Sequence, residues 1–349
     1  MRGVVFTGDR TLDFVSFDDP IPGPGEVVLE IKASGLCGSD LKFYRASREG
    51  GYQALGFKGD GAPVIAGHEP CGIVAAIGQG VDLKTTRIGD RVMVHHYRGC
   101  NMCGHCRTGW TQMCREGATV FGVTGHGAHA PYMKVPVSTL VRLPDDLTFS
   151  TGAAISCGTG TAYGALVRMN LTARDMIAVF GQGPVGLATT QLAAAMGARV
   201  IAVDISTERA ARAKDFGAAH TIDSSQVDPV EAIHELTAGL GVSKAMDTTG
   251  VAAGRSSAVR CAAAWGTVCM VGEGGQLTVD VSTELIRKQL TLIGSWTFST
   301  VGQEDCAGFV SSHNVAVDDL FTQRWALEDA IEAYRLFDSQ TSGKAVFVR

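Results

Sequence analysis

The chain has 349 residues, of which 45% are hydrophobic and 19% are charged, and its formal net charge is −5. This composition is typical of a globular chain of two domains, and the weak negative charge argues against nucleic acid or an anionic membrane as a partner. The N-terminal segment MRGVVFTGDR is not a signal peptide, and no apolar run reaches the roughly 18 residues of a spanning helix. We therefore expect a cytoplasmic protein, in which thiols stay reduced and clustered cysteines bind metal.

The chain before Cys157 is divided by Gly and Pro into short β-type segments, among them GEVVLEIKASG, CGIVAAIG, GDRVMVHH and YMKVPVSTLVRLP. Segments of this kind are typical of a small β-barrel rather than of alternating strands and helices. We therefore expect the first part of the chain to form a β-rich domain.

Four possible metal ligands are scattered through this part: Cys37 in GLCGSD, His68 and Glu69 in GHEPCGIV, and Cys157 in SCGTGTAYGA. A lone His or Cys is more often a packing or surface residue than a ligand. Together, however, a Cys/His/Cys trio leaves a fourth position free for water or substrate, which is the arrangement of a catalytic zinc. Glu69 would hold these ligands in place or act as a transient fourth ligand.

Four further cysteines lie within fifteen residues, in the pattern Cys100-x2-Cys103-x2-Cys106-x7-Cys114. Thiolates at this spacing can converge on one cation, and four of them form the closed tetrahedral set of a structural zinc site. The bacterial ferredoxin pattern is similar, but its fourth cysteine comes after three residues and is followed by proline. We expect a structural zinc; four unrelated reduced cysteines are the alternative.

A strand, a glycine turn, a helix and a second strand are predicted in MIAVFGQGPVGLATTQLAAAMGARVIAVD. The turn contains Gly181-x-Gly183-x-x-Gly186, a spacing that permits a tight turn, approach of the backbone to a pyrophosphate and close helix packing. The second strand ends on Asp204, whose carboxylate accepts hydrogen bonds from ribose hydroxyls and repels a 2′-phosphate, so NAD is favoured over NADP. Arg209, five residues on, would soften that preference if it accommodates a phosphate, and a solvated helix charge is another alternative to the ribose contact that the resemblance described below implies.

The rest of the chain alternates further, which predicts a doubly wound sheet. HTID, KAMDTTG, GTVCMVG and LTLIGSW are expected strands, with helices expected in DPVEAIHELTAG and RSSAVRCAAAW. The C-terminal segment WALEDAIEAYRLFDSQTSGKAVFVR is predicted to form a helix, a turn at Gly343 and a last strand.

These motifs, in this order and at this spacing, resemble the zinc-dependent medium-chain alcohol and polyol dehydrogenases over essentially the whole chain. The resemblance implies an α/β protein whose Rossmann doubly wound parallel sheet, residues 158–294, binds NAD. This domain would be inserted in a GroES-like β-barrel catalytic domain, residues 1–157 and 295–349, with a structural-zinc lobe at about 95–115. The resemblance also places the active site in the cleft between the two domains and implies a homodimer or homotetramer.

The same resemblance assigns residues to sites. Cys37, His68 and Cys157 would bind a catalytic zinc with Glu69 beside them, and the four clustered cysteines a structural zinc, which makes two zinc ions per chain. The residues implied to bind NAD are Gly181, Gly183, Pro184, Val185, Gly186, Asp204, Arg209, Thr161, Val271 and Gly272.

A proton relay is also implied, because Ser39 matches the family hydroxyl that takes the first proton from the alcohol. The histidine that commonly ends this relay is replaced here by Lys42. A lysine shuttles protons near neutral pH only where its environment lowers its pKa; otherwise another group or water completes the relay. Asp40 is either a partner of a zinc ligand or a turn carboxylate.

The expected reaction is hydride transfer from a secondary alcohol to NAD, which gives a ketone. His95 and His96 favour a polar substrate with several hydroxyls, such as a polyol, sugar or cyclitol, unless they are surface histidines. Tyr44, Arg45 and Tyr52 are further candidates for lining this pocket. A dehydrogenase of simple alcohols or amino alcohols is the close alternative, and a non-catalytic dinucleotide-binding protein the more distant one.

Overall fold

The computed structural model describes residues 1–48, 62–339 and 343–349. They divide into two compact units: unit 1 contains Met1–Cys157, Ser299–Ser312 and Phe321–Arg349, and unit 2 contains Gly158–Phe298 and His313–Leu320. Of the segment 295–349 that the sequence assigned to the catalytic domain, residues 295–298 and 313–320 therefore group with unit 2. Within the described ranges, no helix has the length and apolar character needed to cross a membrane.

Unit 1 is built on a seven-stranded sheet in the order β16-β17-β3-β4-β5-β9, with β8 paired to β3. The long strand β3 pairs antiparallel with β4, β8 and the C-terminal strand β17. The strands of this unit are β1 (Arg2–Gly8), β2 (Thr11–Ser16), β3 (Glu26–Gly35), β4 (Pro70–Ile77), β5 (Arg91–Val94), β6 (Tyr97–Arg98), β7 (Thr119–Val120), β8 (Tyr132–Pro136), β9 (Leu140–Arg142), β16 (Phe321–Trp325) and β17 (Lys344–Val348). Its helices are α1 (Asp40–Arg45), α2 (Gly104–Arg107), α3 (Phe149–Ile155), α9 (Thr300–Ser312) and α10 (Ala330–Ser339).

An aromatic core in unit 1 joins the two ends of the chain. Tyr334 of α10 packs its ring against Phe6 of β1 and Tyr44 of α1, with ring centroids 5.0 and 5.6 Å away. All three side chains are buried. Because burial of aromatic surface is a large stabilising contribution, this cluster holds the C-terminal helix against the N-terminal strand.

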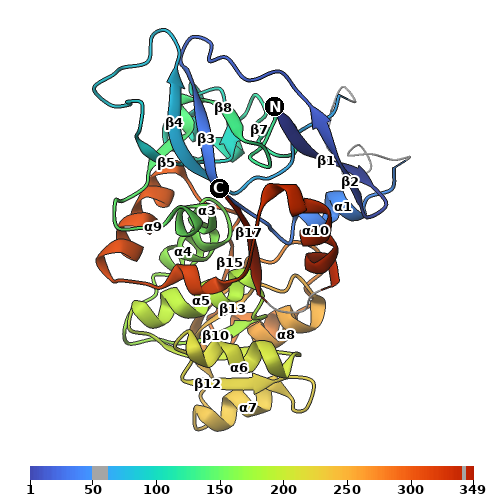
Figure 1. Cartoon of the computed structure of the whole chain (residues 1–349). Helices are drawn as coiled ribbons and strands as arrows, with labels where there is room; N and C mark the ends of the chain where they lie inside the picture. The colour runs from blue at the N-terminus through green and yellow to red at the C-terminus, as the bar shows by residue number, and fades with distance from the viewer. Residues whose placement is uncertain (49–61, 340–342) are drawn as a thin grey trace. The chain divides into compact units, whose positions relative to one another are not determined.

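Unit 2 contains a six-stranded sheet in which every recorded pairing is parallel, in the order β12-β11-β10-β13-β14-β15. Its strands are β10 (Met176–Phe180), β11 (Arg199–Asp204), β12 (His220–Asp223), β13 (Val242–Asp247), β14 (Ala262–Met270) and β15 (Thr291–Gly294), and its helices are α4 (Gly158–Arg168), α5 (Pro184–Ala195), α6 (Thr207–Asp215), α7 (Pro229–Leu236) and α8 (Ala252–Arg260). Helices α5, α6 and α8 lie against the sheet (Figure 1). This strand order is that of the doubly wound Rossmann fold, so the predicted fold class is confirmed.

The predicted elements of unit 2 match the structure with one exception. HTID is β12, and the other three expected strands fall on β13, β14 and β15. In unit 1, the C-terminal segment forms α10 and β17 as predicted, with Gly343, whose φ is +87°, before β17. The helix expected in RSSAVRCAAAW is wrong at its end, because residues 262–265 belong to β14. Alanine favours helix, but Ala262 pairs with Val242 of β13, and this sheet contact overrides the local propensity.

The three glycines of the turn between β10 and α5 differ in what surrounds them. Gly181 has φ +88°, which only glycine adopts readily. A Cβ on Gly186 would lie 1.7 Å from the carbonyl oxygen of Gly181, whereas a Cβ on Gly183 would meet no described atom within 4 Å. The third glycine therefore permits the close packing of α5 on the turn, and the second leaves open space beside the helix N-terminus.

We predict that Gly186→Ala lowers the free energy of unfolding of unit 2 by about 1–3 kcal/mol, because the added methyl group overlaps a backbone oxygen. Gly183→Ala is the matched control and should unfold like the parent chain. Thermal unfolding of both variants measures the difference. Equal melting temperatures for the two variants would contradict the packing role of Gly186.

Candidate active site and metal centres

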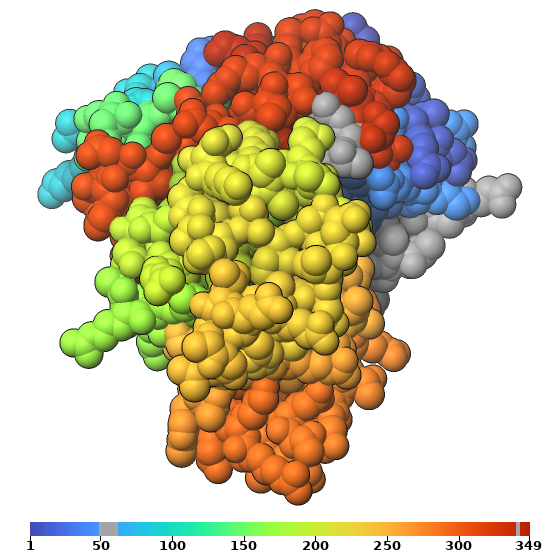
Figure 2. Space-filling view, turned by 90° about the horizontal axis from the view of Figure 1, so that it is seen from below, coloured from blue at the N-terminus to red at the C-terminus, as the bar shows by residue number. Residues whose placement is uncertain are grey.

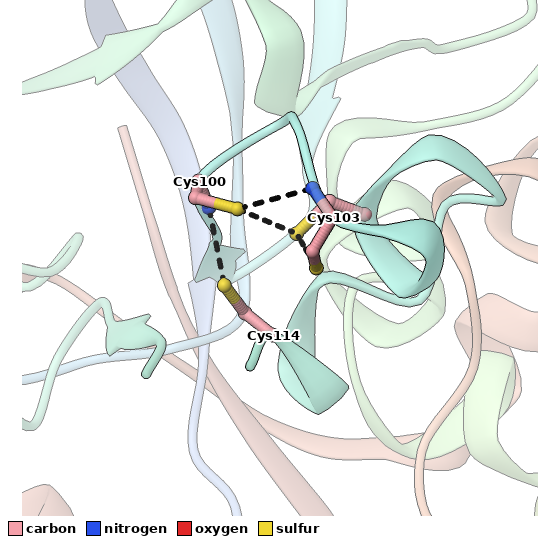
Figure 3. A group of neighbouring side chains, drawn as sticks. Cys100, Cys103 and Cys114 are labelled. Atoms are coloured by element: carbon pink, nitrogen blue, oxygen red, sulfur yellow. Dashed lines mark hydrogen bonds between the residues drawn. The ribbon is translucent and has the colours of Figure 1, made fainter. Parts of the chain in front are cut away.

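Three of the clustered cysteines, Cys100, Cys103 and Cys106, lie between β6 and the end of α2, and Cys114 directly follows the short helical turn Thr111–Met113. Figure 3 shows three of them, Cys100, Cys103 and Cys114, directed toward one another, and all four Sγ atoms lie within 4.8 Å of one another. The Sγ–Sγ distances are 3.5 Å for Cys103–Cys106 and 4.0 Å for Cys100–Cys106. A tetrahedral zinc with Zn–S bonds of about 2.3 Å separates its sulfur ligands by about 3.8 Å, so this donor set fits a zinc ion.

Backbone groups favour the thiolate form in this lobe. The N–H groups of Cys100 and Cys103 donate to Cys114 Sγ and Cys100 Sγ, each at 3.3 Å. Backbone N–H donors of Arg115 and Cys106 lower the pKa of Cys103 to about 6. Because the thiolate is the metal-binding form, the loop conformation prepares Cys103 for a cation, whereas burial raises the pKa of Cys106 to about 12.

A second set of donors meets at the junction of β3 and β4. Ser34 of β3 pairs with Pro70 of β4, so the residues just beyond these strand ends lie side by side. As a result the ligand atoms of Cys37, His68, Glu69 and Cys157 lie within 4.8 Å of one another, and the Sγ atoms of Cys37 and Cys157 are 3.9 Å apart. The thiol separation again suits a tetrahedral zinc. The structure thus brings together the four residues that the sequence predicted as one site.

Asp40 orients the histidine of this set. Its Oδ1 lies 2.8 Å from His68 Nδ1, and its Oδ2 accepts a hydrogen bond from the backbone N–H of Cys37 at 2.9 Å. His68 Nε2 lies on the side of Ser39 Oγ, at 3.1 Å. A carboxylate behind a ligating imidazole fixes the ring and its tautomer, so Asp40 is placed as a partner of a ligand rather than as a turn carboxylate only.

Glu69 carries a buried charge that is balanced from the C-terminal strand. The carboxylate is 0% exposed, and Lys344 Nζ lies 2.8 Å from its Oε1 and 2.6 Å from its Oε2. Burial raises the pKa of Glu69, and the Lys344 ammonium opposes that rise. Lys344 also donates to the carbonyl of Leu36 at 3.1 Å, so one side chain ties β17 to both ends of the ligand junction.

The predicted proton-relay residues occupy different environments. Ser39 is half-buried beside His68 Nε2, at the edge of the donor set. Lys42 lies one turn further along α1 and is exposed. The relay itself stays a prediction, and its last group would stand at the surface.

The histidines before the cysteine lobe are buried, which rules out the surface alternative. His95 and His96 are 0% and 2% exposed, and the His96 ring centroid lies 5.3 Å from that of His68. His96 Nδ1 lies 2.8 Å from the Ser156 carbonyl, and burial lowers the pKa of His96 well below its usual value and that of His95 to about 4. His96 therefore presents a neutral, oriented ring beside the donor set.

Two other pocket candidates are corrected by the structure. Tyr44 packs in the aromatic core rather than toward the donor set, and Arg45 pairs with Asp338 on the surface. Core packing of Tyr44 follows from the amphipathic face of α1, which buries Phe43 and Tyr44 together. Tyr52 lies outside the described residues.

In unit 2, the predicted dinucleotide residues gather at the carboxyl ends of the parallel strands. Gly181 follows β10, Asp204 ends β11, and Val271 and Gly272 follow β14. The N–H groups of Val271 and Gly272 donate to the carbonyl of Asp247 at the end of β13, at 2.9 and 3.1 Å. Pro184 and Val185 begin α5, and Thr161 is half-buried in α4. This edge of a doubly wound sheet is where such folds bind ligands.

Asp204 is held firmly by its own unit. Its Oδ2 accepts from the N–H of Gln182 at 2.6 Å, and its Oδ1 accepts from the N–H of Ser206 at 2.9 Å. Arg209 donates to the same Oδ1 through Nε and Nη2, at 3.0 and 2.8 Å. The alternative of a merely solvated helix charge is therefore wrong for Arg209, which is paired with the acid.

Sequence reasoning missed Lys344, Tyr334 and His129 among the residues around the Cys37/His68/Glu69/Cys157 donor set. The signal for Lys344 was a charged residue that opens an otherwise apolar last strand, KAVFV. The other two carry no local pattern: Tyr334 is one of two aromatic residues on α10, and His129 lies in a loop. Their positions follow only from the sheet pairing and the aromatic core.

We predict that Lys344→Met destabilises the chain by about 3–5 kcal/mol, because it leaves the Glu69 carboxylate buried without its cation. Lys344→Arg keeps the positive charge and should lower the free energy of unfolding clearly less. Urea unfolding of both variants measures the difference. If the Met and Arg variants unfolded with the same free energy, the charge of Lys344 would not be what the site requires.

Comparison with known proteins places these features in one family. The alcohol dehydrogenase GroES-like domain matches residues 23–145, and the zinc-binding dehydrogenase domain matches residues 184–312. An uncharacterized zinc-type alcohol dehydrogenase-like protein of Escherichia coli is 38% identical, over 99% of this chain and 98% of that protein. Sorbitol dehydrogenase 1 of Saccharomyces cerevisiae is 32% identical, over 90% of this chain and 88% of that protein.

A solved structure agrees with these matches over the whole chain. The alcohol dehydrogenase of Thermus sp. ATN1 superposes with a TM-score of 0.90 at 27% identity, covering 100% of this chain and 99% of that one. The two domain matches account for the GroES-like unit and the Rossmann unit found here. The chain belongs to the zinc-dependent medium-chain alcohol and polyol dehydrogenase family, and it is an oxidoreductase.

Proposed function

We propose that the protein is an NAD-linked, zinc-dependent dehydrogenase that oxidises a secondary alcohol of a polyol, sugar or cyclitol to a ketone. The observation that carries this proposal is the convergence of Cys37, His68, Glu69 and Cys157 within 4.8 Å in a member of this family. The protein-derived donors of a catalytic zinc are of this kind, and they leave a position for substrate.

Two zinc ions per chain are proposed, one for each group of donors. Cys37, His68 and Cys157 would hold the first, with Glu69 beside them, and the four clustered cysteines would hold the second. Bound at the first site, zinc supplies a Lewis acid that polarises an alcohol or carbonyl oxygen. The four clustered cysteines form a complete set of four zinc ligands, so the role of that site is structural.

The chain's own residues orient the ligands and move the proton. Asp40 holds His68 through Nδ1, which leaves Nε2 directed to the donor set. Ser39 Oγ, on that side, would accept the proton of the substrate hydroxyl and pass it on. Lys42 is exposed on α1, the helix that begins directly after Ser39. Water at that surface or Lys42 itself would therefore complete the proton transfer.

NAD as the hydride acceptor is supported by Asp204. Its carboxylate is nearly buried at the end of β11, where a ribose hydroxyl can donate to it and a 2′-phosphate would be repelled. The pairing with Arg209 supports the same choice, because the guanidinium is engaged by the acid. The proposed dinucleotide contacts are the glycine turn, Pro184, Val185, Thr161, Val271 and Gly272.

A polar substrate is supported by His96 and by one relative. The buried His96 ring beside His68 offers a hydrogen-bonding group where an apolar substrate would want an apolar wall. The Saccharomyces cerevisiae relative is a sorbitol dehydrogenase. Both point to a small molecule with several hydroxyls.

A homodimer or homotetramer is also proposed. The sheet of unit 2 ends at β15, and several apolar side chains are exposed on this unit. They include Trp265, Val281, Ile286, Leu292 and Trp296. Figure 2 shows the segments after β11, coloured yellow to orange, forming one continuous surface of unit 2. Exposed apolar side chains and an unpaired sheet edge favour self-association. A cytoplasmic location stays a prediction from the sequence.

We predict that the purified protein forms NADH from NAD with polyols, sugars or cyclitols, and more slowly from simple alcohols and amino alcohols. The measurement is the initial rate at 340 nm across such a panel, repeated with NADP. Faster turnover of simple alcohols or amino alcohols would show that these, and not polyols, sugars or cyclitols, are the substrate class. No turnover in protein that retains zinc and binds NAD would favour a non-catalytic dinucleotide-binding role.

We predict that metal analysis finds two zinc ions per chain, one for each donor group, and that Cys157→Ser lowers zinc content by one and abolishes turnover. NAD binding, followed by quenching of intrinsic fluorescence, should be retained because the dinucleotide residues belong to unit 2. Cys269→Ser, at a buried cysteine of unit 2, is the control and should keep both ions. Full activity in Cys157→Ser would assign the third ligand to Glu69 or another group.

A further inference from the structure

A chain of buried hydrogen bonds leads away from the ligand His68 into unit 1. Asp40, which holds His68 Nδ1, lies 3.2 Å from the hydroxyl of Tyr334 through its Oδ2. The Tyr334 hydroxyl lies 2.7 Å from His129 Nε2, and His129 Nδ1 lies 2.8 Å from Ser34 Oγ. Asp40, Tyr334, His129 and Ser34 are each at most 1% exposed. Side chains from five separate parts of the sequence thus form one continuous network.

The direction of these hydrogen bonds follows from their chemistry. Burial lowers the pKa of His129 to about 4, so its ring is neutral and has a single N–H, and burial raises the pKa of Tyr334, which keeps its proton. A carboxylate only accepts hydrogen bonds, so Tyr334 donates to Asp40. Tyr334 then accepts from His129 Nε2–H, and His129 Nδ1 accepts from Ser34. Every donor in the network therefore points toward Asp40.

His129 also supports the ligand turn by direct packing. Gly67, the residue before His68, has φ +91°, and a Cβ there would lie 2.3 Å from His129 Nδ1. The backbone N–H groups of Ala128 and His129 donate to the carbonyls of Gly67 and Ala66, at 2.8 and 2.9 Å. The imidazole of His129 therefore lies under the backbone that carries His68.

We propose that Tyr334 and His129 are positioning residues that hold the Asp40–His68 pair and so set the zinc affinity of the Cys37/His68/Cys157 site. This inference rests on the proposed function only in that the site binds zinc. Donors aligned toward Asp40 stabilise its negative charge in a buried environment, and they fix which carboxylate oxygen faces His68. Because Tyr334 belongs to α10, the packing of the C-terminal helix contributes to metal retention.

The test compares Tyr334→Phe with Tyr44→Phe, which makes the same chemical change in the same aromatic core but outside the network. Zinc release from the metal-loaded protein into a chelator with a colour readout is followed in time, without substrate. We expect Tyr334→Phe to release zinc from the Cys37/His68/Cys157 site about 3–10-fold faster. Mutation of a residue that touches a metal ligand directly lowers metal affinity by about 10–100-fold, and Tyr334 is one residue further from His68. Zinc in the four-cysteine lobe should leave at the parental rate in both variants.

Two further readouts separate positioning from a general loss of stability. Cobalt(II) at the Cys37 site reports ligand geometry in its visible absorption, and we expect Tyr334→Phe to shift this spectrum while Tyr44→Phe does not. His129→Gln keeps an amide N–H toward Tyr334 and should release zinc more slowly than His129→Leu. Ser34→Ala, at the far end of the network, should accelerate release by about 2-fold at most.

The outcomes are distinguishable. Parental zinc release and cobalt spectrum in Tyr334→Phe would overturn the proposal, as would equal effects of Tyr334→Phe and Tyr44→Phe. If Tyr334→Phe fails to fold, the His129→Gln and His129→Leu pair decides, because equal release from both would overturn it as well. Parent protein that binds no zinc at Cys37 would instead overturn the proposed function.

Discussion

Buried negative charge is the constraint on which unit 1 depends. The Glu69 carboxylate meets the half-buried side chains of Cys37 and Cys157, which bind a metal as thiolates, at the β3–β4 junction, and the Asp40 carboxylate lies directly behind His68. Removing such groups from water costs several kcal/mol each unless a cation or hydrogen-bond donors compensate. Lys344 supplies one positive charge from within the chain, and the donor set is suited to a metal ion that supplies the rest.

This constraint explains why the C-terminal segment belongs to unit 1. Strand β17 pairs with the end of β3 at Val346 and Gly35, which places Lys344 beside the ligand junction. Helix α10 places Tyr334 on Asp40 from another direction. A chain that ended before these elements would leave Glu69 without its cation and Asp40 without the Tyr334 hydroxyl. Helix α10 and strand β17 are therefore part of the site as well as of the core.

The two donor groups of unit 1 differ in how they are built. The cysteine lobe is local: its ligands lie within fifteen residues, and backbone N–H groups of the same loop stabilise their thiolates. The other group is assembled from three separate segments and from β17, with half-buried thiols and a fully buried carboxylate. A compact loop can hold a closed metal site by itself, whereas an open site needs a surrounding scaffold to keep its ligands in position.

The features that depend on residues close together along the chain could be predicted from the sequence alone. The cysteine lobe, the turn Gly181–Gly186 and the alternation of unit 2 were predicted because spacing along the chain sets their geometry. The helix predicted over Ala262–Trp265 was wrong, because pairing of this segment with β13 overrides its local helix propensity. Lys344, Tyr334 and His129 were decided only by the tertiary structure. Lys344 contacts Glu69 and Tyr334 contacts Asp40 from 275 and 294 residues away, and His129 contacts Tyr334. A pairing of that kind leaves no periodicity or spacing in the sequence. Such pairings arise because a buried charged or polar side chain needs a hydrogen-bonding or charged partner, and packing can supply that partner from any segment of the chain.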